Sequence, residues 1–412
     1  MALTKNDCEN EIRSWLEDVL KDENLKNLSV KLQGNTEKGE GYMGEIVFVL
    51  AEGTTDDHLT KKYDLVLKCS KRSQALRETV GVKDAFMIEI LIYQKVLPYF
   101  IQYQKEKGVK DPFNSVPKFY GCYIQDDLEV IVFENLKTMG YELWPKKQPL
   151  SRRHIDLIVT EYAKYHATSV AVQSERPTEF QKFIGAMPNG MKKFLETGDF
   201  QTLFEAPIIQ SYELLKNDLD DNVLSRWNGF KNQIGTVLRT AANESTGLNV
   251  IVHGDAWSNN FMFLHEKGEE KIPLKVAVLD WQVTRYASPI VDLSYFLFAC
   301  LSKEDLDDLD DILLMYHTTF VNHSVQLEKP DTLYPLDQFL AEWNQHCKYG
   351  ILMASLLMKI VSTEKDEVMD IAEVAESGED VINTFIIEIR DKENYKRRIR
   401  PIVEYVVKHN LI

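Results

Sequence analysis

The sequence predicts an α+β fold of two lobes, a small β-rich lobe followed by a larger and mostly helical one. The chain has 412 residues, too many for one small core and suited to two or three lobes. Before about residue 133, short β-rich runs alternate with one clear helix. Beyond residue 150 the apolar residues recur mainly at helical spacing. We therefore expect an N-terminal lobe over residues 1–133 and a C-terminal lobe over residues 134–412.

The composition is that of an ordinary globular protein, with 44% hydrophobic and 27% charged residues. The formal net charge of −16 argues against nucleic acid as a partner, because phosphate backbones are bound by clustered Lys and Arg. A charged N-terminus and the lack of a long apolar run predict no signal peptide and no membrane partner. Five widely spaced cysteines without CxxC indicate reduced thiols in a cytoplasmic protein, whose oligomeric state stays open.

Four strands and one helix are expected in the small lobe. GEIVFVL (44–50) and YDLVLKC (63–69) predict neighbouring strands, joined by the polar turn AEGTTDDHLT. DAFMIEILIYQKVL (84–97) has the apolar spacing of a helix, and PKFYGCYI and LEVIVFEN (128–135) predict two further strands.

The large lobe is expected to be helical around one hairpin. SRRHIDLIVTEYAKYHATSVAV predicts a long helix, and NFMFLHE and PLKVAVLD predict two strands joined at KGEEKI. Helical spacing resumes after the hairpin, and the acidic stretch EKDEVMDIAEVAESGED (364–380) is expected to be exposed and mobile.

Polar residues gather unusually between two apolar runs in VIVHGDAWSNNFMF. Asp255 and Asn260 lie on a loop that feeds one strand of the hairpin, and the other strand ends at Asp280. Phosphoryl transfer from a nucleotide needs such a group: a carboxylate for the acceptor hydroxyl, and an amide with a second carboxylate for Mg²⁺. His253 would brace the loop. A polar hairpin turn explains Asp255 alone, but the whole pattern favours the phosphotransfer site.

A kinase also needs a phosphate-covering loop, a strand lysine and a helix glutamate. Gly39, Gly41 and Gly44 have GxGxxG spacing before a strand, although a simple glycine turn explains this equally well. Lys68 ends the apolar strand LVLKC and Glu89 lies in an apolar helix. A charged side chain among apolar neighbours costs free energy unless it has a partner of opposite charge. The alternative is that both side chains are exposed. The order of Lys68 and Glu89 along the chain, relative to the glycine loop, disfavours it.

These motifs resemble the ecdysteroid kinase-like (CHK) family of insect small-molecule kinases, related to choline kinases and aminoglycoside phosphotransferases. The matching pieces run in order from about residue 38 to 300 and are FMIEILIY, IVFENL, YAKYHATS, VHGDAWSNN, and LDWQ followed by SPIVDLSYFL. The resemblance implies a protein-kinase-like fold, with the CHK kinase-like core at about residues 131–310. Where the family commonly has Asp-Phe-Gln, this chain has Asp-Trp-Gln, and because an aromatic is kept we expect the metal site to remain.

The resemblance implies ATP and Mg²⁺ as cofactors, and it assigns roles to particular residues. Asp255 would be the catalytic base, Asn260 and Asp280 the Mg²⁺ ligands, and Lys68, paired with Glu89, the contact to the nucleotide phosphates.

Three further positions follow from the same resemblance. The adenine edge would pair with the backbone from Glu134 to Leu136. Asp292 would anchor the catalytic loop, although a helix N-cap is an equal alternative. His166 is expected to be a satisfied histidine that packs against that loop.

The acceptor is expected to be a small molecule, because the short segment between Asp280 and Asp292 leaves no room for a peptide-seating activation segment. Gly254 also replaces the arginine that reads activation-loop phosphate. The resemblance implies the hydroxyl of an ecdysteroid or another apolar alcohol, including xenobiotics in detoxification. The apolar residues that could line the pocket, or equally form plain core, are Trp144, Phe183, Met187, Phe194 and Trp343.

Two alternatives remain open. A choline- or aminoglycoside-type kinase would take a cationic acceptor, but no carboxylate cluster can be assigned to its pocket. A non-catalytic binding protein or pseudokinase is disfavoured, because every expected polar side chain is present.

Overall fold

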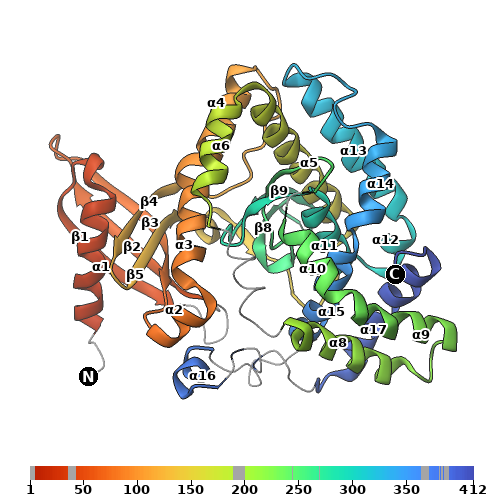
Figure 1. Ribbon diagram of the computed structural model, residues 1–412. Coiled ribbons are helices and arrows are strands. Elements are labelled where there is room, and N and C mark those ends of the chain that lie inside the picture. The colour runs from red at the N-terminus through yellow and green to blue at the C-terminus, as the bar shows by residue number, and fades with distance from the viewer. Residues whose placement is uncertain are drawn as a thin grey trace.

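A five-stranded antiparallel sheet forms the framework of the first lobe in the computed structural model (Figure 1). The structure describes residues 5–35, 43–188, 200–243, 245–268, 270–362, 371–379, 381, 384 and 389–412. The strand order is β1-β2-β3-β5-β4. The bounds in this lobe are α1 (Lys5–Val19), β1 (Lys26–Asn35), β2 (Gly44–Thr54), β3 (Thr60–Ser70), α2 (Gln74–Val80), α3 (Val82–Leu91), α4 (Leu97–Glu106), β4 (Phe119–Gln125) and β5 (Leu128–Glu134).

The two faces of this sheet have different neighbours because side chains alternate along each strand. Leu65 and Leu67 of β3 face a buried cluster with Trp15 and Leu16 of α1, so that α1 covers the outer face. Lys68 follows on the opposite face, on the side of α3. Helix α1 and strand β1 were not among the elements predicted from the sequence.

Three predicted elements of this lobe prove longer than expected. Strands β2 and β3 continue into the segment assigned to a polar turn, because Glu52 and Lys62 are cross-strand neighbours and form an ion pair of 3.0 Å. The predicted helix 84–97 starts earlier and ends later: α3 runs through a π-helical turn (Ile92–Val96) into α4.

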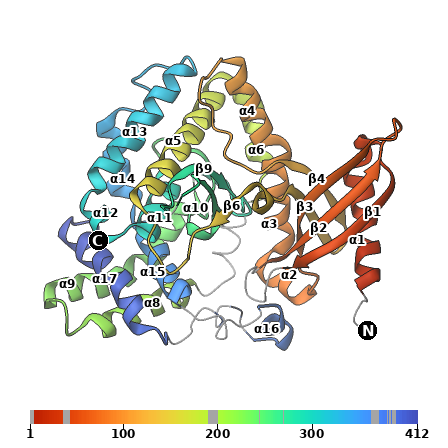
Figure 2. The same ribbon diagram turned by 180° about the vertical axis from the view of Figure 1, so that it is seen from behind.

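The second lobe surrounds a short sheet with helices, as predicted (Figure 2). Strands β8 and β9 form the expected antiparallel hairpin, with Phe261 opposite Val278, and β6 extends it. The bounds are β6 (Tyr141–Leu143), α5 (Arg152–Glu175), α6 (Pro177–Ala186), α8 (Phe200–Leu215), α9 (Asp221–Phe230), α10 (Ile234–Ala242), β7 (Val250–Val252), β8 (Phe261–His265), β9 (Pro273–Val278), β10 (Arg285–Ala287), α11 (Ile290–Cys300), α12 (Lys303–Asp307), α13 (Leu309–Gln326), α14 (Leu336–His346), α15 (Lys348–Ser362), α16 (Ile371–Ser377) and α17 (Lys392–Lys408).

Part of the acidic stretch expected to be exposed and mobile is an ordered helix. Helix α16 packs against α2 of the first lobe, which both views show (Figures 1 and 2). Ile371 and Val374 are buried, and their i, i+3 spacing gives the helix one apolar face that outweighs its acidic composition. Residues 364–370 and 380 of the stretch lie outside the described residues.

All five cysteines are free thiols, as predicted. Among the described helices, none combines the length and the apolar character needed to cross a bilayer.

Candidate active site

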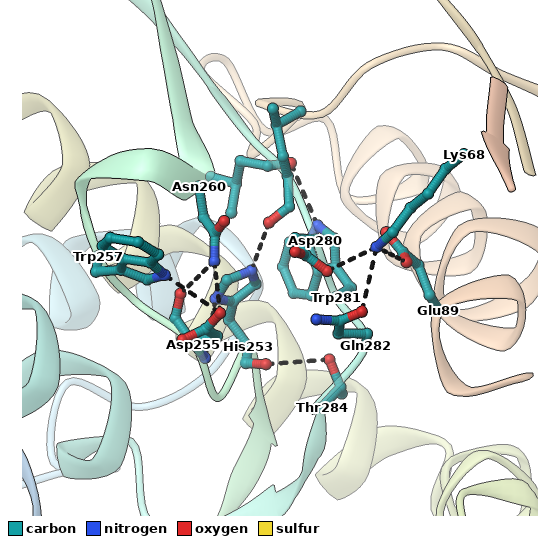
Figure 3. Close-up of polar contacts among 12 residues, drawn as sticks. Lys68, Glu89, His253, Asp255, Trp257, Asn260, Asp280, Trp281, Gln282 and Thr284 are labelled. Carbon is teal, nitrogen blue, oxygen red and sulfur yellow. Dashed lines mark hydrogen bonds and ion pairs between the residues drawn. The ribbon is translucent and has the colours of Figure 1, made fainter. Parts of the chain in front are cut away.

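The loop between β7 and β8 holds Asp255 through several hydrogen bonds (Figure 3). The Nδ2 group of Asn260 donates to the Asp255 main-chain oxygen at 2.9 Å and to its Oδ2 at 2.8 Å. The indole Nε1 of Trp257 donates to the same Oδ2 at 3.3 Å. Burial and the negative charge of Asp280 raise the pKa of Asp255 above its ordinary value. The carboxylate is therefore a partly buried acceptor with a fixed orientation.

His253 is fully buried and ties this loop to the end of β9. Its Nε2 lies 2.8 Å from the Leu279 carbonyl oxygen and must donate to it. Its Nδ1 accepts the N–H of Asp255 at 3.3 Å. These two bonds are those of a neutral imidazole with its proton on Nε2. Through them His253 connects the loop to the residue that follows β9.

Asp292 anchors the loop backbone from α11. Its two carboxylate oxygens accept the main-chain N–H groups of His253 and Gly254, each at 2.7 Å, and His166 donates to Oδ2 at 3.1 Å. The N-cap alternative is wrong, because Pro289 occupies the cap and Asp292 lies inside the first turn. Burial alone would raise the pKa of Asp292, but the donated bonds from His166 and Gly254 lower it.

Position 254 admits only glycine in this geometry. Gly254 has φ of +91°, and a Cβ there would lie 2.5 Å from the Val283 carbonyl oxygen. The loop thus passes against the β10 segment more closely than any side chain allows.

Lys68 connects the two lobes at the centre of the site. Its Nζ lies 2.5 Å from Glu89 Oε2, 2.7 Å from Asp280 Oδ1 and 3.4 Å from Gln282 Oε1. The side chains of Lys68, Glu89 and Asp280 are 11%, 1% and 29% exposed. The expected pairing of Lys68 with Glu89 is therefore present, and Asp280 makes it a group of three.

The electrostatics of this group of three keep the lysine charged. Burial opposes the charge of Lys68, but Asp280 and Glu89 together raise its pKa. Burial raises the pKa of Glu89 to about 7, and the nearby charge of Asp280 adds to that effect against the opposing influence of Lys68.

Asp280 and Asn260 lie at adjacent ends of the β8–β9 hairpin. The N–H of Leu279 donates to the Asn260 carbonyl at 2.9 Å, which brings the two segments together. Asp280 takes a left-handed conformation, with φ of 65°. The fully buried Trp281 then packs edge to face against the imidazole of His253, with 4.7 Å between ring centroids. Tryptophan in place of the usual phenylalanine is thus accommodated as a core side chain.

The donor set at this hairpin fits a magnesium ion bound together with a nucleotide. Because the Asn260 amide turns its NH₂ group to Asp255, its oxygen points away from that carboxylate. Asp280 uses only Oδ1 toward Lys68, so Oδ2 remains for a cation. Among the described residues no group of three or more His, Cys, Asp or Glu could hold a metal. A site of one carboxylate and one amide suits Mg²⁺, which takes its remaining ligands from phosphates and water.

The expected nucleotide contacts are only partly visible. Gly39 and Gly41 lie outside the described residues. Gly44 begins β2, where a Cβ would lie 2.8 Å from the Cys69 carbonyl, so close packing accounts for this glycine. At the crossover, the Glu134 N–H donates to the Lys118 carbonyl at 3.0 Å. Leu136 opens a 3₁₀ turn, and the first N–H of a helix has no partner within it.

Tyr295 is a site residue that was not predicted from the sequence, and its hydroxyl donates to Asp255 Oδ1 at 3.0 Å. It lies on α11 one turn beyond Asp292, and this i, i+3 spacing was the signal that could have found it. Trp257 and Gln282, which also bond to site residues, were missed as well.

The apolar residues considered for an acceptor pocket are mostly core. Phe183 and Trp343 are buried, and Trp343 stacks on Phe298 with 6.0 Å between ring centroids. Trp144 packs on His154 with centroids 4.3 Å apart, Met187 is partly buried, and Phe194 lies outside the described residues.

The model of the ecdysteroid kinase-like family matches residues 38–329, more than half of the chain. The chain belongs to the ecdysteroid kinase-like family. Membership confirms the resemblance noted in the sequence and, with the two lobes described above, the α+β protein-kinase-like fold. It supports a small-molecule kinase and leaves the acceptor open.

Solved structures of glucosamine kinase resemble the chain weakly. Crystal form B gives a TM-score of 0.28 at 9% identity, covering 95% of this chain and 97% of that one. A complex with glucosamine, ADP and inorganic phosphate gives 0.29 at 10%, covering 98% and 100%. Crystal form A gives 0.33 at 8%, covering 92% of each. Scores this low support no conclusion about the acceptor. No protein of curated function matches the chain.

Proposed function

We propose that the protein is an ATP- and Mg²⁺-dependent kinase that phosphorylates a hydroxyl of a small apolar alcohol, such as an ecdysteroid or a xenobiotic. One observation carries the proposal: residues from both lobes meet in one hydrogen-bonded site. Asp255 and Asn260 come from the loop, Asp280 from the hairpin, and Lys68 and Glu89 from the small lobe (Figure 3).

Each of these residues has a chemical task in phosphoryl transfer. Asp255 accepts the proton of the alcohol while the alcohol oxygen bonds to the γ-phosphorus and the β–γ bridging bond of ATP breaks. Lys68, positioned by Glu89, balances phosphate charge as ADP forms. Asn260 and Asp280 would hold Mg²⁺, which supplies positive charge to the phosphates.

The adenine would be bound at the crossover between the lobes. We assign its edge to the backbone of Glu134 and Leu136, where β5 ends and the first N–H of the 3₁₀ turn is available as a donor. The glycine-rich segment with Gly39, Gly41 and Gly44 would cover the phosphates.

The surroundings of Asp255 favour an apolar acceptor. Trp257 lies beside Asp255 on the side away from Lys68 (Figure 3), and Tyr295 touches its other oxygen. Both of these neighbours of Asp255 are aromatic and neither is a carboxylate, which suits an apolar acceptor better than a cationic one. Because an indole ring also attracts quaternary ammonium groups, the experiment must include cationic alcohols.

The test is to incubate the purified chain with Mg²⁺-ATP and a panel of alcohols, and to detect phosphorylated product by mass. The panel contains ecdysteroids, plant sterols and other apolar alcohols, with choline, ethanolamine and an aminoglycoside as cationic members. Asp255→Asn prepared in parallel controls for contaminating kinases.

The outcomes separate the three functional readings. Product from apolar alcohols alone supports the proposal. Product only from cationic alcohols moves the assignment to a choline- or aminoglycoside-type kinase. Nucleotide binding without product from any alcohol indicates a non-catalytic binding protein.

A further inference from the structure

Tyr295 links helix α11, which anchors the catalytic loop, to the carboxylate of Asp255. Helix α11 carries Asp292 and Tyr295 one turn apart, so both face the loop. Asp292 holds the loop through its backbone, and the Tyr295 hydroxyl donates to Asp255 Oδ1 at 3.0 Å. Tyr295 is only 2% exposed, so this hydroxyl is fixed in place.

The two oxygens of Asp255 differ in how many donors they already have. A carboxylate oxygen has about two lone-pair positions. Oδ2 accepts from Asn260 at 2.8 Å and from Trp257 at 3.3 Å, which uses both positions. Oδ1 accepts from Tyr295 and keeps one position.

We propose that Tyr295 is a positioning residue for phosphoryl transfer, which fixes the rotation of the Asp255 carboxylate so that Oδ1 receives the proton of the acceptor hydroxyl. This inference rests on the proposed kinase function. In the step, the acceptor O–H bond breaks and its proton goes to the remaining lone pair of Oδ1, while the new O–P bond forms and the ADP leaving group departs with the electrons of the broken P–O bond.

Tyr295 is suited to donate and not to act as a base. Burial raises the pKa of its phenol well above the ordinary value, and the charge of Asp255 adds to this effect. The hydroxyl therefore keeps its proton at neutral pH. The ring is held edge to face against Tyr349, with 6.3 Å between centroids, so Phe at this position keeps the packing and removes only the donor.

The first measurement is the steady-state kinetics of Tyr295→Phe. Losing a hydrogen bond to a charged group is expected to lower kcat about ten- to a hundredfold. KM for ATP and the calorimetric affinity for Mg²⁺-ATP should stay unchanged, because the tyrosine does not touch the nucleotide residues. Tyr103→Phe is the matched control: it removes a buried tyrosine–carboxylate bond of 2.8 Å to Glu175 on α5 and should leave kcat unchanged.

The second measurement does not depend on turnover. A double-mutant cycle of Tyr295→Phe with Asp255→Ala, followed by urea denaturation, should show non-additive losses if the two side chains are in contact. Additive losses overturn the inference, even if the protein phosphorylates alcohols. Non-additive losses with unchanged kcat overturn the positioning role alone. Non-additive losses in a protein that phosphorylates no alcohol overturn the proposed function, and the positioning role with it.

Discussion

Lys68→Met should destabilise the protein more than Glu89→Gln, because the lysine is shared by two carboxylates. Methionine keeps the volume and removes the charge, which leaves Glu89 (1% exposed) and Asp280 (29% exposed) without their common partner. Glu89→Gln leaves Lys68 paired with Asp280 at 2.7 Å. The sequence suggested a coupled pair, and the structure predicts an asymmetry between its members.

The expected size of the loss follows from the burial of Glu89. Breaking a buried ion pair costs about 3–5 kcal/mol when the remaining partner stays charged and buried. Glu89 can lose its negative charge by taking up a proton, because its pKa is already raised from 4.5 to about 7 beside Lys68. In Lys68→Met the folded pKa exceeds the unfolded one, so the unfolding free energy falls as pH rises, by about 1.4 kcal/mol per pH unit. Wild-type Glu89 shares that slope up to its own pKa of about 7, so only the interval above pH 7 adds to the difference between the two proteins. Relative to the wild type we expect a loss of about 2 kcal/mol at pH 6 and about 3 kcal/mol or more at pH 8.

Urea denaturation followed by circular dichroism at both pH values measures this difference. The matched control is Lys182→Met, whose partner Glu179 is also 2.5 Å away but whose pair is exposed, with side chains 65% and 44% accessible. Such surface pairs contribute about 0–1 kcal/mol. If Lys68→Met loses no more than Lys182→Met, with no dependence on pH, Glu89 is not stranded and the reasoning fails.

Three further changes test the loop and the hairpin. Asp255→Asn should keep its affinity for Mg²⁺-ATP and lose about 10²–10⁴ in turnover, and initial rates near those of the wild type would remove its role as the base. Asp280→Ala should weaken Mg²⁺-dependent ATP binding more than Asn260→Ala, because a carboxylate brings a full charge to the cation; calorimetry that finds equal, metal-independent affinities would count against the site. Gly254→Ala should lower the unfolding free energy by about 2–3 kcal/mol, because a Cβ there meets a carbonyl oxygen at 2.5 Å at positive φ. Gly185→Ala, with nothing within 4 Å of its Cβ, should not, and equal melting temperatures would show that the loop can move away.

The parts of the site that the sequence predicted are those set by local geometry. A hairpin brings its two ends together whatever surrounds it, so Asn260 and Asp280 could be placed from the strand pattern alone. Lys68 and Glu89 were found because charges in apolar elements need partners. Tyr295 has no charge that needs a partner, so only its i, i+3 spacing from Asp292 pointed to the loop, and its contact depends on how α11 approaches that loop.

Other features depended on tertiary contacts that no local pattern carries. The glycine spacing predicts that Gly44 belongs to a phosphate-covering loop, and its close approach to the Cys69 carbonyl becomes visible only once β2 and β3 are paired. The acidic composition of residues 364–380 predicts an exposed and mobile segment, whereas the position of helix α16 follows from the small apolar face that α2 covers.

The Lys68–Asp280 bond explains why the site can hold an unfavourable backbone conformation. Asp280 has φ of 65°, a left-handed conformation that costs a non-glycine residue about 1–2 kcal/mol. The conformation lets Trp281 turn inward onto His253 while the Asp280 side chain reaches Nζ of Lys68 at 2.7 Å. A partly buried ion pair to a lysine of the other lobe offsets a cost of this size. Under the proposed function, a nucleotide that drew Lys68 to its phosphates would remove that partner, and a cation bound to the Asp280 carboxylate would replace it. Metal binding would then be coupled to nucleotide binding through Lys68 and Asp280, and we expect ATP affinity to depend on Mg²⁺ more steeply in the wild type than in Lys68→Met.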